Sequence, residues 1–158
     1  MTLGLFAPDD AATEAIGAAL ASALVPGDVV TLEGDLGTGK TALARAIIRA
    51  RLGDPHHEVP SPTFAIVQPY RGIVHADLYR LSDETELFEL GIFEDEEAIV
   101  LVEWPQRAPM LFDRPGLRIH LDMGKDGHGR KISIRTGAGR ESAGLAKVLA
   151  PWAEDGTH

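Results

Sequence analysis

The sequence predicts an α/β domain of three layers, in which a mixed parallel and antiparallel sheet lies between helices. Three observations lead to this fold class. The pattern of a buried strand breaks into a glycine-rich loop that opens an amphipathic helix, and strand and helix patterns alternate through the first half of the chain. Paired strand patterns follow in the second half. With 158 residues, the chain has room for one domain with a sizeable core, so we expect residues 1–158 to fold as a single unit.

The first three elements are predicted from apolar spacing and turn residues. Apolar residues four apart, with acids at the front, indicate a helix over residues 10–24, and Pro26 with the glycine after it ends the pattern. Residues 28–34 have the composition of a buried strand. A second amphipathic helix is expected from Lys40 to a stop at Gly53.

The middle of the chain predicts a strand pair, a helix and a further strand. Two strand patterns, at residues 63–70 and 72–79, surround a turn at Arg71. An acidic helix is expected over residues 82–90 and a short apolar strand over 98–104. The pairing of the first two patterns marks the point where antiparallel strands join the expected sheet.

The last third predicts a helix from Pro105, a hairpin over residues 117–136 and a final helix from Ser142. Alternation along the hairpin places four apolar side chains inward and four basic side chains outward. The inward residues are Ile119, Leu121, Ile132 and Ile134, and the outward residues are Arg118, His120, Lys131 and Arg135.

Composition restricts the class of function. The formal net charge of −9 repels phosphate backbones at long range, so unaided binding of nucleic acid is disfavoured. The chain has no cysteine, which excludes disulfides and thiolate metal sites. No apolar run approaches the roughly 18 residues that a membrane span needs, and the N-terminus lacks the pattern of a leader. We therefore expect a cytoplasmic protein without membrane contact.

The glycine-rich loop fits the pattern G-x-x-x-x-G-K-[ST], with Gly34, Gly39, Lys40 and Thr41 at its fixed positions. A chance match in a chain of this composition is on the order of one in a few hundred. Backbone N–H groups of such a loop surround a phosphate at the positive end of the helix dipole, Lys40 reaches the outer phosphates and the Thr41 hydroxyl binds Mg²⁺. The fold is thus predicted to be P-loop NTPase-like. The residues expected around the phosphates are Asp35, Leu36, Gly37, Thr38, Gly39, Lys40, Thr41 and Ala42.

Two further acids are candidates for chemistry on the nucleotide. GTPases commonly read guanine through an N-K-x-D motif, and this chain contains no asparagine, which favours ATP. The strand over 98–104 delivers Glu103 to the sheet edge where α/β proteins bind ligands. Strand alternation puts His75 and Asp77 on one face. Glu103 and Asp77 are therefore the candidates for holding Mg²⁺ and for orienting the attacking nucleophile.

Four motifs in order, "GDLGTGKT", "SPTF", "HADLYRL" and "VEWP", resemble those of the TsaE family, the bacterial P-loop ATPases of the tRNA threonylcarbamoyl-adenosine modification pathway. The resemblance covers residues 10–108. It implies that Thr63 is a switch threonine that senses metal and outer phosphate, that Asp77 is a metal-linked acid, that Glu103 is the Walker-B-like carboxylate, and that Trp104 packs beside the site. Lys40, Asp77 and Glu103 are then the catalytic residues, and Thr41, Asp77 and Glu103 the metal ligands.

The resemblance also implies the cofactors and the partners. ATP and Mg²⁺ would be the cofactors, and the partners would be a carbamoyl-transferring subunit and its paralogous scaffold, with tRNA engaged only indirectly. Two other functions remain open at this point: a small-molecule P-loop kinase, and a nucleotide-binding module without turnover. For the basic face of the hairpin we favour solvated surface, with contact to tRNA or a partner as the alternative.

Overall fold

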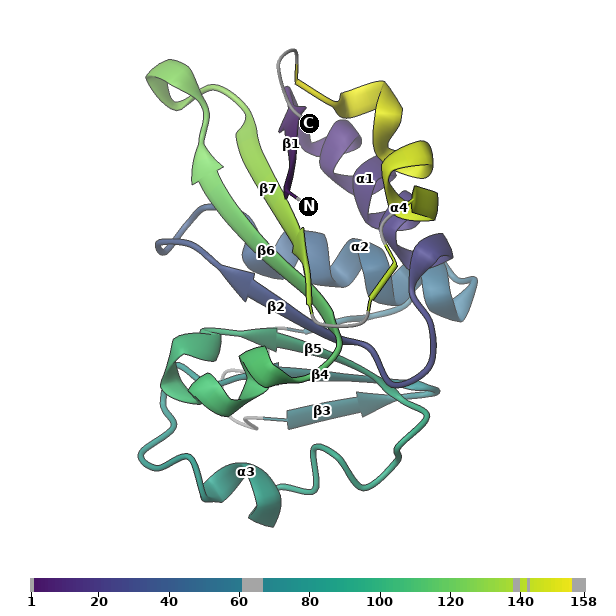
Figure 1. Cartoon of the computed structure of the whole chain (residues 1–158). Coiled ribbons are helices and arrows are strands. Elements are labelled where there is room, and N and C mark those ends of the chain that lie inside the picture. The colour runs from purple at the N-terminus through teal and green to yellow at the C-terminus, as the bar shows by residue number, and fades with distance from the viewer. Residues whose placement is uncertain (1, 61–66, 138–139, 142, 155–158) are drawn as a thin grey trace.

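The computed structural model describes residues 2–60, 67–137, 140–141 and 143–154. The SPTF motif with Thr63 lies outside these residues. Seven strands of the described residues form one sheet, and the helices that connect them lie on its faces (Figure 1). The strands are β1 (Thr2–Ala7), β2 (Val29–Glu33), β3 (Val67–Tyr70), β4 (Ile73–Asp77), β5 (Ile99–Glu103), β6 (Gly116–Met123) and β7 (Arg130–Thr136). The α-helices are α1 (Asp10–Ala23), α2 (Lys40–Leu52), α3 (Glu86–Glu89) and α4 (Ala143–Leu149).

The sheet has the order β1-β7-β6-β2-β5-β4-β3 and is mixed. Strands β6, β2, β5 and β4 are parallel to their neighbours in this central part, whereas β1, β7 and β3 pair antiparallel at the two sides. Parallel strands end at one edge of a sheet, which is where α/β proteins bind ligands. The carboxyl ends of β2, β4, β5 and β6 therefore share an edge, and the expected mixed sheet is confirmed.

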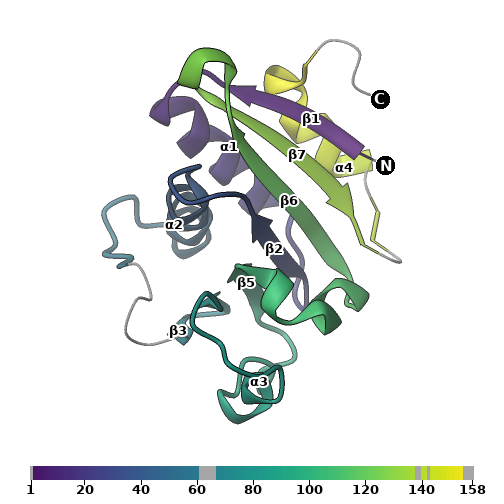
Figure 2. The ribbon, with the colours of Figure 1, turned by 90° about the vertical axis from the view of Figure 1, so that its left-hand side faces the viewer.

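An apolar cluster covers each face of the sheet, which gives the three layers that the sequence predicts. On one face α1, α2 and α4 contribute Leu20, Ile47 and Leu149, each fully buried. On the other face, Leu87 of α3 and Leu111 of a short 3₁₀ helix cover the second cluster (Figure 2). Among the described residues, no helix combines the length and the apolar character needed to cross a membrane.

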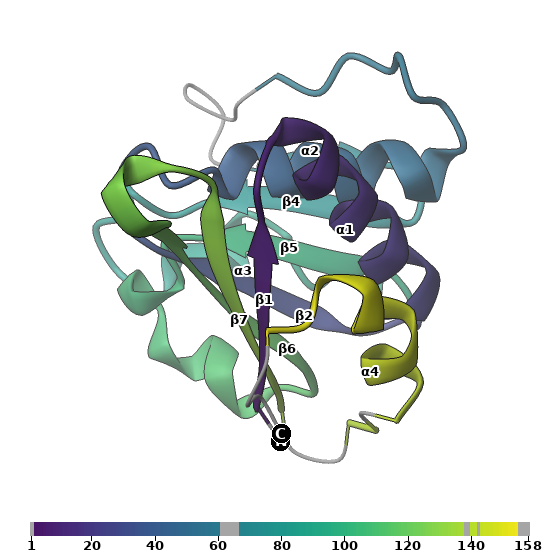
Figure 3. The same cartoon turned by 90° about the horizontal axis from the view of Figure 1, so that it is seen from above.

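Helices α1 and α2 lie side by side over the sheet (Figure 3). A side chain at Gly17 of α1 would collide with the methyl group of Ala46 on α2. The absence of a side chain at Gly17 thus lets the two helices approach closely. Because the glycine-rich loop leads into the amino end of α2, the packing of α1 against α2 helps to fix the position of this loop.

Most elements lie where the sequence predicts them, including the four inward residues of the hairpin, each at most 1 % exposed. Three differences occur. Strand β1 was not expected, because its six residues pair with β7 from the far end of the chain. The acidic helix shrinks to the single turn of α3, since Asp83 accepts a hydrogen bond from the Thr85 N–H in a local turn that competes with the helix. The helix expected from Pro105 is two 3₁₀ segments, separated at Ala108, whose backbone is not helical because a proline follows it.

Candidate functional site

The glycine-rich loop runs from the end of β2 to the start of α2, and three glycines shape it. Gly37 and Gly39 have φ angles of 82° and 100°, in a region that side chains rarely adopt. A Cβ at Gly34 would lie 2.5 Å from the carbonyl oxygen of Leu121 on β6, so the loop is seated directly against that strand. Gly39 precedes α2 without a side-chain cap, which leaves the first N–H groups of the helix open to an anion.

Lys40 is buried at the first position of α2 and folds back over the loop. Its Nζ donates to the carbonyl oxygens of Gly34 and of Asp35, the latter at 2.9 Å, and lies 4.3 Å from the centroid of the Trp104 ring. Burial lowers the pKa of Lys40 from its usual 10.5, against the raising effect of Glu103, Asp77 and Asp35. The ammonium is thus partly desolvated, and phosphate oxygens could replace the loop carbonyls as its acceptors.

Three polar side chains project from β4 and β5 on the face that α2 covers. The parallel register pairs Asp77 with Glu103, and alternation places His75 on the same face as Asp77. Glu103 is 2 % exposed and accepts two hydrogen bonds, one from the Thr41 hydroxyl at 2.8 Å and one from His75 Nε2 at 2.7 Å. The end of β5 and the start of α2 are therefore joined through a buried carboxylate.

Asp77 lies beside this carboxylate at the end of β4 and is half-buried. Burial raises the pKa of Asp77 above its usual 3.8, and the nearby charge of Glu103 raises it further, whereas the hydrogen bond from the Tyr79 N–H at 3.0 Å lowers it. A cation placed between the two carboxylates would relieve this repulsion.

Trp104 follows β5 with a left-handed backbone, at φ 59° and ψ 49°. This conformation is uncommon for a bulky residue and costs about 1–3 kcal/mol. The turn directs the indole ring to Lys40 and against Tyr79, with a distance of 5.0 Å between the ring centroids. The strained turn thus supplies the aromatic wall that faces the ammonium group.

The residues fit ATP and Mg²⁺. The loop and the open helix end suit phosphate, and Thr41, Glu103 and Asp77 offer hydroxyl and carboxylate oxygens, the ligand type that Mg²⁺ prefers. Within the described part of the chain, no three His, Cys, Asp or Glu side chains are grouped so as to hold a metal ion by themselves. Mg²⁺ is usually bound by one or two carboxylates together with substrate phosphates, and Glu103 and Asp77 are two such carboxylates.

One residue near the loop was missed by the sequence analysis. Arg130 begins β7, and its Nη2 lies 3.5 Å from the carbonyl oxygen of Gly37. It reaches the loop because β7 pairs with β6, and β6 lies directly against β2. The sequence predicts the hairpin that contains Arg130. Its contact with Gly37 depends on the order of strands in the sheet, which the spacing of residues does not reveal.

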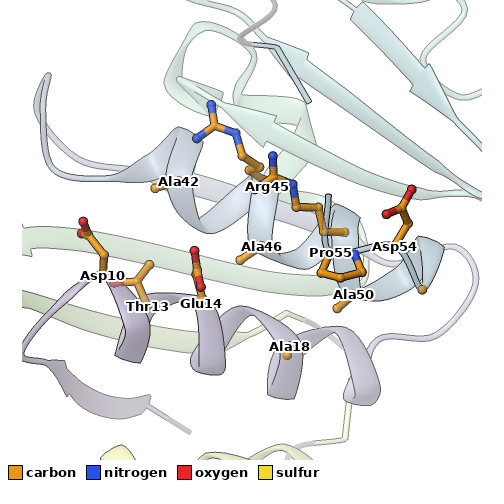
Figure 4. A pocket seen from close by; sticks show the side chains of 12 residues that line it. Asp10, Thr13, Glu14, Ala18, Ala42, Arg45, Ala46, Ala50, Asp54 and Pro55 are labelled. Carbon is orange, nitrogen blue, oxygen red and sulfur yellow. The ribbon is translucent and has the colours of Figure 1, made fainter. Parts of the chain in front are cut away.

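Two clefts adjoin the loop and helix α2. One lies between α1 and α2, has a volume of about 470 Å³ and starts beside Ala42, with Ala18 and Ala46 along its floor (Figure 4). The other, of about 780 Å³, lies between the loop residues Leu36 and Thr38 and the turn that joins β6 to β7. The glycine-rich loop thus borders the cleft next to the turn between β6 and β7, and α2 borders the cleft next to α1.

The structure brings five of the predicted site residues together: Lys40, Thr41, Asp77, Glu103 and Trp104. Asp35 to Gly39 form the loop that leads into α2, and Ala42 lies in the first turn of that helix; their contact with phosphate stays a prediction. Thr63 lies outside the described residues, so its role stays a prediction.

Comparison with known proteins gives consistent matches. The sequence model of the family described as "Threonylcarbamoyl adenosine biosynthesis protein TsaE" matches residues 7–132. The chain is similar to the "tRNA threonylcarbamoyladenosine biosynthesis protein TsaE" of Rickettsia felis, with 37 % identity over 82 % of this chain and 78 % of that protein. It is 41 % identical to the protein of the same name from Synechocystis sp., over 70 % of this chain and 74 % of that protein. A crystal structure of Bacillus subtilis YdiB superposes with a TM-score of 0.68 and 27 % identity, covering 96 % of this chain and 93 % of that one.

Proposed function

The chain belongs to the TsaE family, and from this membership and the geometry of the site we propose that it binds Mg-ATP and hydrolyses it slowly to support the tRNA threonylcarbamoyl-adenosine modification complex. The family takes part in the biosynthesis of threonylcarbamoyladenosine. The proposal goes further in naming the nucleotide, the reaction and the dependence on partners.

One observation carries the proposal, the hydrogen bond of 2.8 Å from the Thr41 hydroxyl to the Glu103 carboxylate. It connects the last fixed position of the phosphate-loop motif to the acid at the end of a neighbouring parallel strand. Because the hydroxyl donates its proton to Glu103, the lone pairs of its oxygen remain available to a cation. P-loop nucleotide hydrolases place a Ser or Thr ligand and a strand-end acid around Mg²⁺ in this way.

Each site residue has a role in this proposal. The loop N–H groups and Lys40 hold the phosphates, and Thr41 with Glu103 and Asp77 anchors the metal and its water shell. Bound Mg²⁺ supplies positive charge that neutralises the phosphate oxygens. One of the two carboxylates orients the attacking water and accepts its proton. The Trp104 ring, which Tyr79 contacts, covers one side of the ammonium group.

The partner part of the proposal combines the net charge with the family resemblance. The formal net charge of −9 gives the chain few means to bind tRNA alone. The resemblance implies the partners to which that task would fall, a carbamoyl-transferring subunit and its paralogous scaffold. Slow turnover by the isolated chain would leave room for stimulation when a docked partner excludes water from the site. ATP and ADP would then favour different docked states, and a ten-fold preference requires about 1.4 kcal/mol.

The test is ATP turnover by the purified chain, measured alone, with the two partner proteins, and with the partners and tRNA. We expect slow ADP release that rises with the partners and is absent from the Lys40→Ala variant. A rise that requires a metabolite instead of the partners would favour the small-molecule kinase. Turnover equal in the parent and in Lys40→Ala would contradict the phosphate-site assignment.

A further inference from the structure

Glu103 is held from two sides in the buried part of the site. Its Oε1 accepts the Thr41 hydroxyl at 2.8 Å and its Oε2 accepts His75 Nε2 at 2.7 Å. The side chains of His75 and Glu103 are 0 % and 3 % exposed, so water does not compete for this second contact. A single donor would leave the carboxylate free to rotate, whereas two opposed donors fix its plane.

The fixed carboxylate in turn orients Thr41. A threonine hydroxyl has one proton and two lone pairs, and it rotates to suit its surroundings. When the proton is committed to Glu103, the lone pairs of the Thr41 oxygen face away from the carboxylate and remain free to accept a cation. The chain of contacts from His75 through Glu103 to Thr41 thus sets the direction in which the threonine oxygen can bind a metal ion.

We infer that His75 is a positioning residue for the metal site: its Nε2–H locks Glu103, and through Glu103 it presets the Thr41 oxygen as an Mg²⁺ ligand. The inference rests on the proposed function and deepens it. His75 does not touch the metal or the nucleotide, because its Nε2 is committed to Glu103 and the ring is fully buried. Side chains that orient metal ligands in this way typically contribute 10- to 100-fold to metal affinity or activity.

The other ring nitrogen strengthens this assignment. Among the described residues, His75 Nδ1 has no hydrogen-bond partner although it is buried. A buried unsatisfied polar atom costs about 1–3 kcal/mol, so Nδ1 adds no stabilising contact of its own. The described contacts of the ring thus leave the hydrogen bond to Glu103 as its one polar interaction.

The test separates metal-dependent from metal-independent binding of nucleotide. ADP binding is measured by calorimetry at several Mg²⁺ concentrations and in EDTA, for the parent and for His75→Phe and His75→Gln. Phenylalanine keeps a ring but cannot donate, so it should raise the Mg²⁺ concentration for half-maximal enhancement 10- to 100-fold and leave the affinity in EDTA within two-fold. Glutamine carries an N–H near the place of Nε2 and should recover much of the loss. His120→Gln, at an exposed histidine of β6, is the matched control and should behave as the parent.

The possible results distinguish a failure of the proposed function from a failure of the positioning role of His75. A parent protein that binds no nucleotide contradicts the proposed function itself. A parent that binds, with His75→Phe unchanged in its Mg²⁺ dependence, overturns the positioning role alone. Equal losses in EDTA and in Mg²⁺ would also overturn it, since they indicate a general packing defect.

A measurement on the parent chain keeps the inference testable even where a variant fails to fold. Nitrogen NMR of histidine-labelled protein should find His75 with its proton on Nε2, as the contact to Glu103 requires. Adding Mg²⁺ with ADP should shift this signal more than ADP in EDTA does. A proton on Nδ1 instead, or no response specific to Mg²⁺, would contradict the inference.

Discussion

The two ends of the central parallel strands each contain a buried carboxylate, and the two are held differently. Asp28 precedes β2 at the amino edge of the sheet, and Glu103 ends β5 at the carboxyl edge; each is 2 % exposed. Asp28 accepts Arg140 Nε at 3.0 Å and the Val25 N–H at 2.9 Å. Its negative charge therefore meets a guanidinium group that is permanently charged.

Within the described part of the chain, Glu103 has no guanidinium or ammonium group hydrogen-bonded to it. Its two donors there are a hydroxyl and an imidazole, and the Nζ of Lys40 donates instead to carbonyl oxygens of the loop. The carboxylate at the amino edge is thus neutralised within the fold, whereas the one at the carboxyl edge is oriented but left to attract a cation. We therefore propose that Asp28 serves stability and that Glu103 serves binding of a cation.

The largest effect should come from removing the charge of Glu103. Glu103→Gln keeps the size of the side chain but can neither attract a cation nor accept a proton, so ATP turnover should fall about 10²- to 10⁴-fold. Affinity for ATP in EDTA should survive, because the phosphates are held by the loop, whereas the Mg²⁺-dependent part of the affinity should weaken with the loss of this metal-anchoring carboxylate. Steady-state turnover and calorimetry check both parts; a variant that hydrolyses ATP at the parent rate would show that this carboxylate is structural, as Asp28 is.

The corresponding change at the other edge should act on stability instead. Asp28→Asn leaves the partly buried Arg140 without its counter-charge, which should lower the free energy of unfolding by about 3 kcal/mol while ATP affinity stays the same. Urea denaturation measures the loss. Asp54→Asn, at an exposed aspartate in contact with His57, is the matched control and should change little. An unaltered midpoint in Asp28→Asn would remove the contrast between the two edges.

Removing the ammonium group of Lys40 should weaken the site without weakening the fold. The charge-assisted hydrogen bonds to phosphate are worth about 1.5–3 kcal/mol, so Lys40→Ala should lower ATP affinity roughly ten- to hundredfold. Calorimetry with Mg-ATP measures the change, and circular dichroism reports whether the fold is intact. Unchanged affinity would mean that the loop does not bind the phosphates.

The smallest effect is a dependence of stability on pH at Asp77. Because burial raises the pKa of Asp77 in the folded state, the folded chain holds this proton more tightly than the unfolded chain, so the contribution to stability falls as pH rises from 3.8 through the raised value. Asp77→Asn should therefore be slightly more stable than the parent at pH 7, without ligand, and the gain should vanish below pH 3.8.

Asp83 provides the control of opposite sign for this pH dependence. Hydrogen bonds from Thr85 lower its pKa, so its contribution is present above pH 3.8 and is lost as pH falls through the lowered value. Asp83→Asn should accordingly lower stability at neutral pH. Thermal melts of both variants across the pH range decide the matter, and changes of the same sign would contradict the effect ascribed to burial.

The sequence predicted the parts of the site that depend on local pattern. A fixed spacing defines the phosphate loop, the end of an apolar run marks Glu103, and strand alternation places His75 and Asp77 on one face. The prediction did not extend to the hydrogen bond between His75 and Glu103, because it depends on which strand lies beside β4.

The parts that escaped prediction join segments far apart in the chain. Strand β1 pairs with β7, Arg130 reaches the loop across β6, and Asp28 meets Arg140 from 112 residues away. None of these contacts has a repeat or spacing that identifies it in the sequence. The backbone of Trp104 was equally hidden, since a left-handed turn at tryptophan runs against its preference.

The close approach of α1 and α2 at Gly17 and Ala46 has a consequence for how such sequences can diverge. A side chain at Gly17 would have to be matched by the loss of the Ala46 methyl group, and a larger residue at Ala46 could not be matched at all, so the helices would separate and shift the start of α2. Leu36, which is 75 % exposed in the phosphate loop, is under no such packing restraint. We therefore expect related sequences to vary more at Leu36, which lies inside the glycine-rich motif, than at Gly17, which lies outside it.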